Sequence, residues 1–284
     1  MIAALWGRLR HGVALLFQQP DWPAFAGDDW PQHIMDVAVH DRFHAKQGRT
    51  IARWSLDSND RRLTVYLKRH YRLPRWAGWL ATLFPDHGWS PGLGEWQRLR
   101  SAVEHGVPAP RAVAAGQWVG PWGRLRSFIA IEELADELPL HEAIPLAARR
   151  LSPLAFARWK CELIVELVRL VRLLHDRRWF HNDLYLCHFY IAEADTRQVP
   201  ASWRERVHLI DFHRYGQARF TAAYARVKDL GQLLYSSSNV AGITDHDRLC
   251  FWRCYRGARE RPWLRRAILF KCGRYQRHNA RKRK

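Results

Sequence analysis

The chain has 284 residues, 48% hydrophobic and 26% charged, so it is long and apolar enough to bury a sizeable core and is not intrinsically disordered. Its formal net charge of +19 favours polyanionic partners, namely nucleotides, nucleic acid, anionic lipid or acidic proteins, without choosing among them. The five cysteines show no disulfide-like spacing, which favours a reducing, cytoplasmic compartment, and no window of about 18 uncharged apolar residues predicts a membrane-spanning helix.

Residues 1–40 are predicted to form an N-terminal extension. Apolar side chains recur at helical spacing within it, at Leu5, Leu9, Val13 and Leu16. The pattern indicates an amphipathic helix that either lies on a bilayer surface or docks on the body of the protein.

The next segment has the pattern of a β-rich lobe. Residues 43–54 predict a hairpin that turns near Gly48, and residues 63–68 predict a strand that ends in Lys68. Residues 71–94 follow as an irregular insertion rich in aromatic and basic side chains.

The rest of the chain changes from strands to helices. A helix is predicted over residues 94–105, further strands over residues 111–134, and a mainly helical pattern from Pro153 onward. Strands first and helices afterwards predict an α+β fold with two lobes, a small β-rich one over residues 41–135 and a larger helical one over residues 136–284.

Two aspartates each follow a short hydrophobic strand. Asp183 lies in a His-Asn-Asp turn after Phe180, and Asp211 follows the apolar run that ends at Ile210. Phosphoryl transfer from a nucleotide needs such a pair, because one carboxylate accepts or orients the proton of the acceptor hydroxyl and the other holds the metal ion. We therefore predict a kinase with Asp183 as its catalytic base and Asp211 as its principal metal ligand.

Residues earlier in the chain are predicted to bind ATP. Lys68 closes a strand from which it reaches the phosphates, and Glu95 on the following helix is expected to hold it. The turn at Gly48 would lie over the phosphates, although it has one glycine and not the G-x-G-x-x-G pattern. Glu132 and Leu134 follow an apolar strand and fit either a hinge whose backbone contacts adenine or an ordinary acidic loop.

Residues around the two aspartates are predicted to support them. His181 would anchor the turn, and Arg214 follows Asp211 closely enough to support the site or its substrate. His188 stands where protein kinases have a metal-binding asparagine, and it would bind the metal directly, bind it through water, or orient a phosphate. Asp229 would either brace the backbone of the catalytic turn or cap a helix.

These features resemble those of the lipopolysaccharide core heptose kinases over roughly residues 41–240. The segments that carry the resemblance occur in order: Gly48-Arg49-Thr50, Leu67-Lys68-Arg69-His70, Glu95-Trp96, Ser127-Phe128-Ile129, Glu132-Glu133-Leu134, Tyr185 with Cys187-His188-Phe189, Ile210-Asp211-Phe212-His213-Arg214, Lys228-Asp229-Leu230, and Tyr235-Ser236. The Cys-His-Phe continuation is the most specific of them.

The resemblance implies an ATP- and magnesium-dependent kinase that phosphorylates a heptose hydroxyl of the lipopolysaccharide inner core. It implies a lipid-linked core acceptor and work at the cytoplasmic face of the inner membrane, and it places Asp183, Asp211, Lys68 and Glu95 in the roles given above. Two alternatives stay open: a kinase for another sugar or a protein, and a non-catalytic, kinase-shaped binding protein.

Basic and aromatic residues outside the site suggest an anionic membrane surface as a partner. Arg75, Trp76 and Trp79 lie in the insertion, and a basic C-terminal tail covers residues 274–284. The alternative is a packed insertion and a solvated tail. An acidic acyl carrier protein is compatible with the charge, although no residue demands it, and specific nucleic-acid binding is not expected because no recognised motif accompanies the charge.

Overall fold

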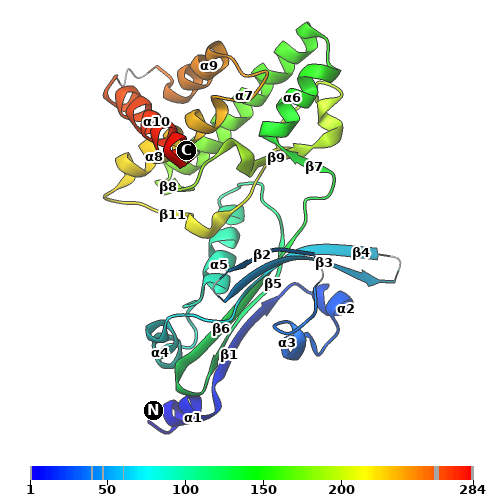
Figure 1. The fold of residues 1–284 in the computed structure, drawn as a ribbon, viewed down its shortest axis with the longest axis vertical. Helices are drawn as coiled ribbons and strands as arrows, with labels where there is room; N and C mark the ends of the chain where they lie inside the picture. Colours follow the sequence, from blue (N-terminus) through cyan, green and yellow to red (C-terminus); the bar gives the residue numbers. More distant parts are fainter. Residues whose placement is uncertain (1, 40, 47, 60, 259–261, 283–284) are drawn as a thin grey trace. The chain divides into compact units, whose positions relative to one another are not determined.

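The computed structural model describes residues 2–39, 41–46, 48–59, 61–258 and 262–282, which form two compact units (Figure 1). The first unit spans residues 1–101 and 110–134, and the second spans residues 102–109 and 135–284. The boundary after Leu134 lies one residue from the predicted one. The first unit is rich in β-structure and the second is mainly helical, so the predicted α+β class is confirmed.

The first unit contains a six-stranded antiparallel sheet in the order β1-β5-β6-β4-β3-β2. Its strands are β1 (Val13–Gln18), β2 (Asp41–Lys46), β3 (Arg49–Ser58), β4 (Arg61–His70), β5 (Ala112–Gly120) and β6 (Arg124–Glu132). The predicted hairpin is confirmed, because β2 and β3 pair across Gly48. Gly48 has φ +81°, a conformation that glycine adopts without steric strain.

The helices of the first unit lie around this sheet. They are α1 (Ile2–His11), α2 (Trp22–Ala26), α3 (Trp30–His33), α4 (Arg75–Leu83), α5 (Pro91–Glu104) and the short 3-10 turn η1 (Pro121–Gly123). The insertion predicted to be irregular therefore contains a regular helix, α4. Helix α5 was expected and begins a few residues earlier than its pattern indicates.

In its described part, the predicted N-terminal extension over residues 1–40 belongs to the first unit and contributes a strand to its sheet. The predicted helix ends at His11, and Gly12 then turns the chain with φ +80°. Val13 and Leu16 belong to β1, which pairs with β5 at the edge of the sheet. The apolar run fits a helix and a strand equally well in sequence, and the unpaired edge of β5 selects the strand.

A buried arginine ties the N-terminal segment to the sheet. Arg69 of β4 is 1% exposed, and its Nη1 donates hydrogen bonds to the carbonyl oxygens of Ile34, Met35 and Val37. Its Nε donates to Thr50 Oγ1 on β3. Three backbone acceptors outside regular structure are thus satisfied by one guanidinium, which offsets the cost of burying its charge.

The described residues of the second unit form five long helices, with short strands around its loops. The helices are α6 (Leu140–Arg150), α7 (Pro153–Asp176), α8 (Ala222–Ser237), α9 (Asp245–Arg256) and α10 (Pro262–Lys282). The strands are β7 (Glu137–Pro139), β8 (Trp179–Phe180), β9 (Phe189–Ala192), β10 (His208–Leu209) and β11 (Gly216–Gln217), and the short 3-10 turns are η2 (Leu186–His188), η3 (Glu193–Thr196) and η4 (Phe212–Arg214). No helix in the described part of the chain is long and apolar enough to cross a bilayer.

Two polar or basic segments of the second unit are packed and not loosely exposed. In residues 193–206, Trp203 is buried against Trp159, and Trp159 Nε1 donates to the Asp195 carbonyl oxygen at 2.7 Å. The basic residues from Arg274 onward were expected to form a tail, and as far as Lys282 they belong to α10. In both cases apolar residues interspersed among the polar ones pack on neighbouring helices.

Replacement of Arg69 by Met should lower the free energy of unfolding by about 3 kcal/mol, because the buried carbonyl oxygens of Ile34, Met35 and Val37 lose their donor. The matched control is Arg62→Met, which removes only the exposed pair with Asp57 and should leave the free energy of unfolding essentially unchanged. Urea unfolding of the wild type and the two variants measures both values. Equal stability of the two variants would contradict the prediction.

Candidate functional site

The loop that carries Asp183 is held by a buried carboxylate. Asp229, which is fully buried in α8, accepts hydrogen bonds from the backbone amides of His181 at 3.0 Å and Asn182 at 2.8 Å. Asn182 adopts a left-handed conformation with φ +62°, so the loop needs such external fixing. These are the contacts of the bracing interpretation. The helix-cap interpretation is wrong, because α8 begins well before Asp229, at Ala222.

Two buried histidines complete this support. His175 Nε2 lies 3.3 Å from Asp229 Oδ2, and its Nδ1 lies 2.8 Å from the Tyr255 hydroxyl. His181 Nε2 donates to the Ile210 carbonyl oxygen at 2.9 Å and so joins the Asp183 loop to the residue before Asp211. Burial lowers the pKa of both imidazoles and outweighs the nearby Asp229 carboxylate, so both rings are neutral. His181 thus occupies the anchoring position that the sequence predicts.

Asp183 is oriented by a side chain that the sequence patterns did not single out. Gln232 Nε2 donates to Asp183 Oδ1 at 3.0 Å, while Gln232 Oε1 accepts from the Leu184 amide at 3.2 Å. Gln232 stands three residues after Asp229, on the same face of α8. That spacing is the signal that would have identified it.

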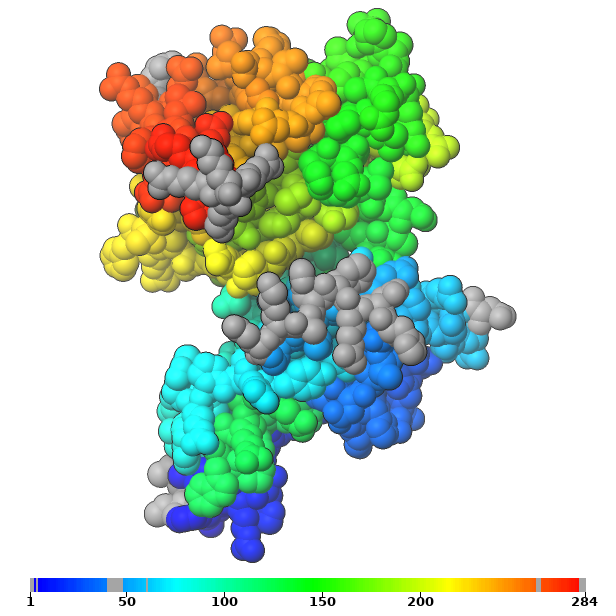
Figure 2. Space-filling model, viewed as in Figure 1, coloured from blue at the N-terminus to red at the C-terminus, as the bar shows by residue number. Residues whose placement is uncertain are grey.

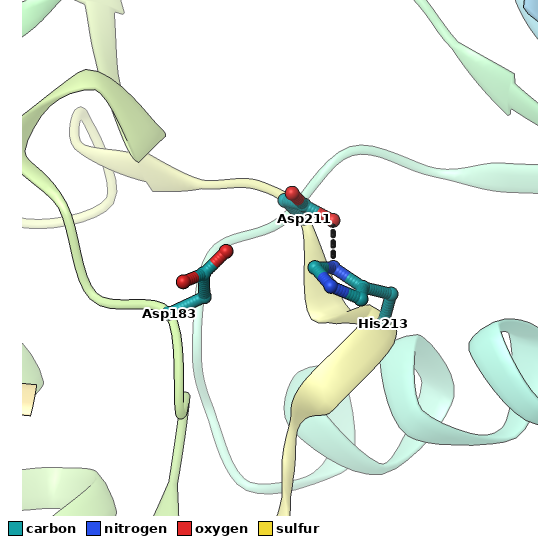
Figure 3. Close-up of side chains that lie close together, drawn as sticks. All are labelled: Asp183, Asp211 and His213. Carbon is teal, nitrogen blue, oxygen red and sulfur yellow. Dashed lines mark hydrogen bonds and ion pairs between the residues drawn. The ribbon is translucent and has the colours of Figure 1, made fainter. Parts of the chain in front are cut away.

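Asp211 lies close to Asp183 (Figure 3). One ligand atom from each of Asp183, Asp211 and His213 can be chosen so that all three lie within 4.8 Å of one another. His213 Nδ1 is 2.5 Å from Asp211 Oδ1, and Asp211 is held in a left-handed conformation with φ +68°. Such strain in a residue other than glycine often marks a functional position. The carboxylates offer the hard oxygen ligands that Mg²⁺ prefers, and imidazole is a poorer ligand for that ion.

His188 contacts the Asp183 backbone and lies near the Asp211 carboxylate, although it is not one of these three residues. Its Nδ1 donates to the Asp183 carbonyl oxygen at 2.7 Å, and its Nε2 lies 3.9 Å from Asp211 Oδ2. Burial alone would lower the pKa of His188, but Cys187, the Asp183 carbonyl and the Asp211 carboxylate together raise it. Because Nδ1 donates to the carbonyl oxygen, Nε2 is the ring nitrogen that faces the Asp211 carboxylate, and it would either ligate a metal as a neutral ring or donate to a phosphate oxygen as a protonated one. Both interpretations of His188 stay predictions, and His213 is the imidazole that can place a nitrogen within 4.8 Å of both carboxylates.

Positive charge gathers beside the Asp183 loop. Lys228 Nζ donates to the Asn182 carbonyl oxygen, and Asn182 Nδ2 donates to the Arg214 carbonyl oxygen at 3.1 Å. Burial, reinforced by the Arg214 guanidinium, lowers the pKa of Lys228. The Arg214 carbonyl oxygen therefore helps to hold the loop. The Arg214 side chain is exposed and can contact an acidic ligand.

In the first unit the predicted Lys68–Glu95 pair is formed. Lys68 Nζ of β4 lies 2.5 Å from Glu95 Oε1 of α5, and the side chains are 14% and 6% exposed. Helix α5 approaches the sheet closely at Gly92, where a Cβ atom would lie 2.5 Å from the Phe128 carbonyl oxygen. That close approach requires glycine and sets the position of Glu95.

Glu132 and Leu134 lie at the end of the first unit. The Glu132 amide donates to the Arg111 carbonyl oxygen at 2.8 Å, and its carboxylate accepts from Arg111 Nε at 2.7 Å. The Glu132 amide is therefore already paired within the first unit, and the contact of this hinge segment with adenine stays a prediction. Leu134 is the last residue before the boundary between the units, as a hinge position requires.

His70 lies at the end of β4, beside cationic side chains. Burial, Arg49 and Lys68 together lower its pKa to about 4. The imidazole is therefore neutral near pH 7 and adds no further positive charge beside Lys68.

Comparison with known proteins places these residues in a family context. The sequence profile of the lipopolysaccharide kinase (Kdo/WaaP) family matches residues 41–255. The chain is 34% identical over 168 residues to the lipopolysaccharide core heptose(I) kinase WaaP of Pseudomonas aeruginosa, a match covering 58% of this chain and 60% of that protein. It is 30% identical over 174 residues to the protein of the same name from Escherichia coli K12, covering 59% and 62%. The chain thus spans about three fifths of the length of these curated relatives.

A solved structure extends the similarity over nearly the whole chain. The structure described as WaaP in complex with acyl carrier protein superimposes with a TM-score of 0.65 and 26% sequence identity. The match covers 94% of this chain and 98% of that one. It therefore extends beyond residues 41–255, the part that the family profile matches.

The depressed pKa of His70 predicts a loss of stability in acid. Its unfolded-state pKa is about 6.5, so the unfolded chain binds the proton first, and stability is lost as the pH falls from about 6.5 towards 4. Between pH 8 and pH 5, the protonation of this residue should lower the free energy of unfolding by about 2 kcal/mol. Urea unfolding at the two pH values should show a pH dependence smaller by that amount in His70→Asn.

The control for this experiment is His278→Asn, which changes an exposed histidine of α10. The pH dependence of the stability of this variant should equal that of the wild type, because the variant keeps His70 and all the buried histidines. An unchanged pH dependence in His70→Asn would contradict the electrostatic account of His70.

Proposed function

The chain belongs to the lipopolysaccharide kinase (Kdo/WaaP) family, and on this premise we propose that it transfers the γ-phosphate of ATP to a hydroxyl of an inner-core heptose of lipopolysaccharide. The observation that carries the proposal is the adjacent pair Asp183 and Asp211, each held on a braced loop. Related kinases named for this activity add support.

Asp183 is the proposed catalytic base. Gln232 donates to its Oδ1, which fixes the carboxylate plane and leaves Oδ2 to accept the proton of the acceptor hydroxyl. The Asp229 contacts with the loop backbone keep this geometry before the substrate arrives. Positioning of this kind supplies much of the rate enhancement in phosphoryl transfer, because the protein does little covalent chemistry.

The residues proposed to act on the nucleotide have separate roles. Lys68, oriented by Glu95, would contact phosphate oxygens. Asp211 would hold Mg²⁺, whose fit is supported by the carboxylate oxygens of Asp183 and Asp211. When bound, the ion would neutralise charge on the phosphates. His188, with its raised pKa, would donate to a phosphate oxygen.

The acceptor is proposed to be acidic and lipid-linked. Lys228 and the exposed Arg214 lie beside the Asp183 loop and supply positive charge where the acceptor would approach. The net charge of +19 favours the same class of ligand. Such an acceptor and ATP occur together at the cytoplasmic face of the inner membrane, which is therefore the proposed place of action.

An acyl carrier protein is a proposed partner. The structurally similar WaaP forms a complex with acyl carrier protein, and the superposition covers 94% of this chain. An acidic carrier protein complements the strongly basic surface expected from the composition.

Asp183→Asn should lower phosphate transfer from radiolabelled ATP with magnesium to dephosphorylated core lipopolysaccharide by about 100-fold or more, because the general base is lost. The fold should be retained, since Asn keeps the oxygen that accepts from Gln232. The matched control is Asp176→Asn, an exposed carboxylate near the end of α7, which should transfer at the wild-type rate. Full activity of Asp183→Asn would refute the assigned role.

Binding of acyl carrier protein is testable by co-elution in gel filtration. We expect a complex at low ionic strength that weakens as salt is added, because the attraction is largely between opposite charges. An unrelated acidic protein of similar net charge serves as the control. Equal co-elution of the two proteins would reduce the interaction to non-specific charge attraction and oppose the proposed partnership.

A further inference from the structure

Helix α4 buries its small residues and exposes its large apolar ones, which is the reverse of a helix that packs on a soluble core. Its small residues Ala77, Gly78, Ala81 and Thr82 are buried, while Trp76, Trp79 and Leu83 are 63%, 42% and 46% exposed. A helix that only completes the core turns its largest apolar side chains inward. The outward tryptophans therefore contribute little to folding and form an exposed apolar area of the kind that marks a docking surface.

A backbone contact fixes this orientation. A Cβ atom on Gly78 would lie 1.8 Å from the Gly123 carbonyl oxygen, so the helix backbone rests directly on the turn η1 between β5 and β6. Only glycine allows this approach. The large side chains on either side of Gly78 have no room beneath the helix and must face away from the sheet.

The turn and the N-terminal helix add tryptophans to the same region. Trp122 of η1 is 64% exposed and adopts a left-handed conformation with φ +61°, which is strained for a bulky residue. Trp6 of α1 is 61% exposed. Helices α1 and α4 and the turn η1 contact one another, and in the space-filling view they form one end of the first unit (Figure 1, Figure 2). We call Trp6, Trp76, Trp79, Leu83 and Trp122 the tryptophan surface.

The charges around the tryptophan surface are almost all positive. Exposed basic side chains lie on the same elements and the residues next to them: Arg10, His11, Arg72, Arg75, Arg124 and Arg126. The sequences of α1, α4 and η1 contain no Asp or Glu, and Asp86 is the acidic residue that follows α4 most closely. Tryptophan combined with arginine suits the interface of an anionic bilayer, where the rings lie at the level of the headgroups and the cations attract them.

We propose that the tryptophan surface docks the first unit onto anionic lipid headgroups. The proposal rests on the proposed function in one respect, the lipid-linked acceptor, which favours a bilayer over a protein as the occupant. It also combines the two alternatives for the N-terminal helix, because α1 contacts α4 and η1 and at the same time exposes Trp6. The residues of the catalytic loops in the second unit are not part of this surface.

The experiment is co-sedimentation of the full chain with phosphatidylglycerol-containing vesicles and with phosphatidylcholine vesicles, in the absence of ATP. The double variant Trp76→Ser with Trp79→Ser, and the single variant Trp122→Asn, remove rings from the surface, and Asn tolerates the left-handed backbone at position 122. We expect each lost ring to weaken partitioning into anionic vesicles by about tenfold. Trp263→Ser, which removes a 58% exposed tryptophan from α10, should bind as the wild type does.

Three outcomes would overturn the proposal: no sedimentation of the wild type with anionic vesicles at low ionic strength, equal sedimentation of all variants, or an equal loss in Trp263→Ser. Thermal melting of the variants with and without ATP shows whether they fold and bind nucleotide. Vesicle binding with no phosphate transfer would refute the proposed function and leave the docking surface supported. Phosphate transfer with no vesicle binding would refute the docking surface and leave the proposed function supported.

Discussion

The buried Asp229 carboxylate is the interaction on which the candidate catalytic loops depend. It satisfies two loop amides and contacts a neutral histidine, so its charge is buried with hydrogen-bond partners, without which burial would be strongly destabilising. One turn of α8 carries the other supports, because Lys228 holds the Asn182 carbonyl and Gln232 holds Asp183. A single rigid helix thus sets a loop that contains a left-handed, non-glycine residue. Preorganisation of this kind is what phosphoryl transfer requires of a protein.

Strand β4 has a similar central role in the first unit. Its side chains alternate between two faces, so Arg69 lies on the buried face with Leu67, while Lys68 and His70 lie on the other. Arg69 secures the N-terminal segment, and Lys68 pairs with Glu95. Lys68, which is proposed to contact phosphate, and Arg69, which stabilises the unit, are therefore adjacent in sequence but lie on opposite faces of the strand. A shift of the strand by one residue would exchange them.

The exposed tryptophans of α4 and the strained Trp122 stand apart from both systems. They add little to the core and are positioned by close backbone contact between Gly78 and Gly123. The high tryptophan content thus has two origins, because Trp22, Trp30 and Trp159 pack inside while the tryptophan surface faces outward. Composition alone does not separate these two groups, since the same residue type serves a core and an interface equally well.

Local patterns along the chain were enough to predict the lobe order, the hairpin at Gly48, and the places of Lys68, Glu95, Asp183 and Asp211, because each depends on a short run of strand, turn and charged residue. Three features follow only from tertiary contacts: residues 13–18 join the sheet, Gln232 orients Asp183, and His213 brings a nitrogen close to both carboxylates. Tertiary contacts also decided which face of α4 is buried. These outcomes depend on which surfaces meet in space, and a linear pattern that fits two environments equally well carries no information about that choice.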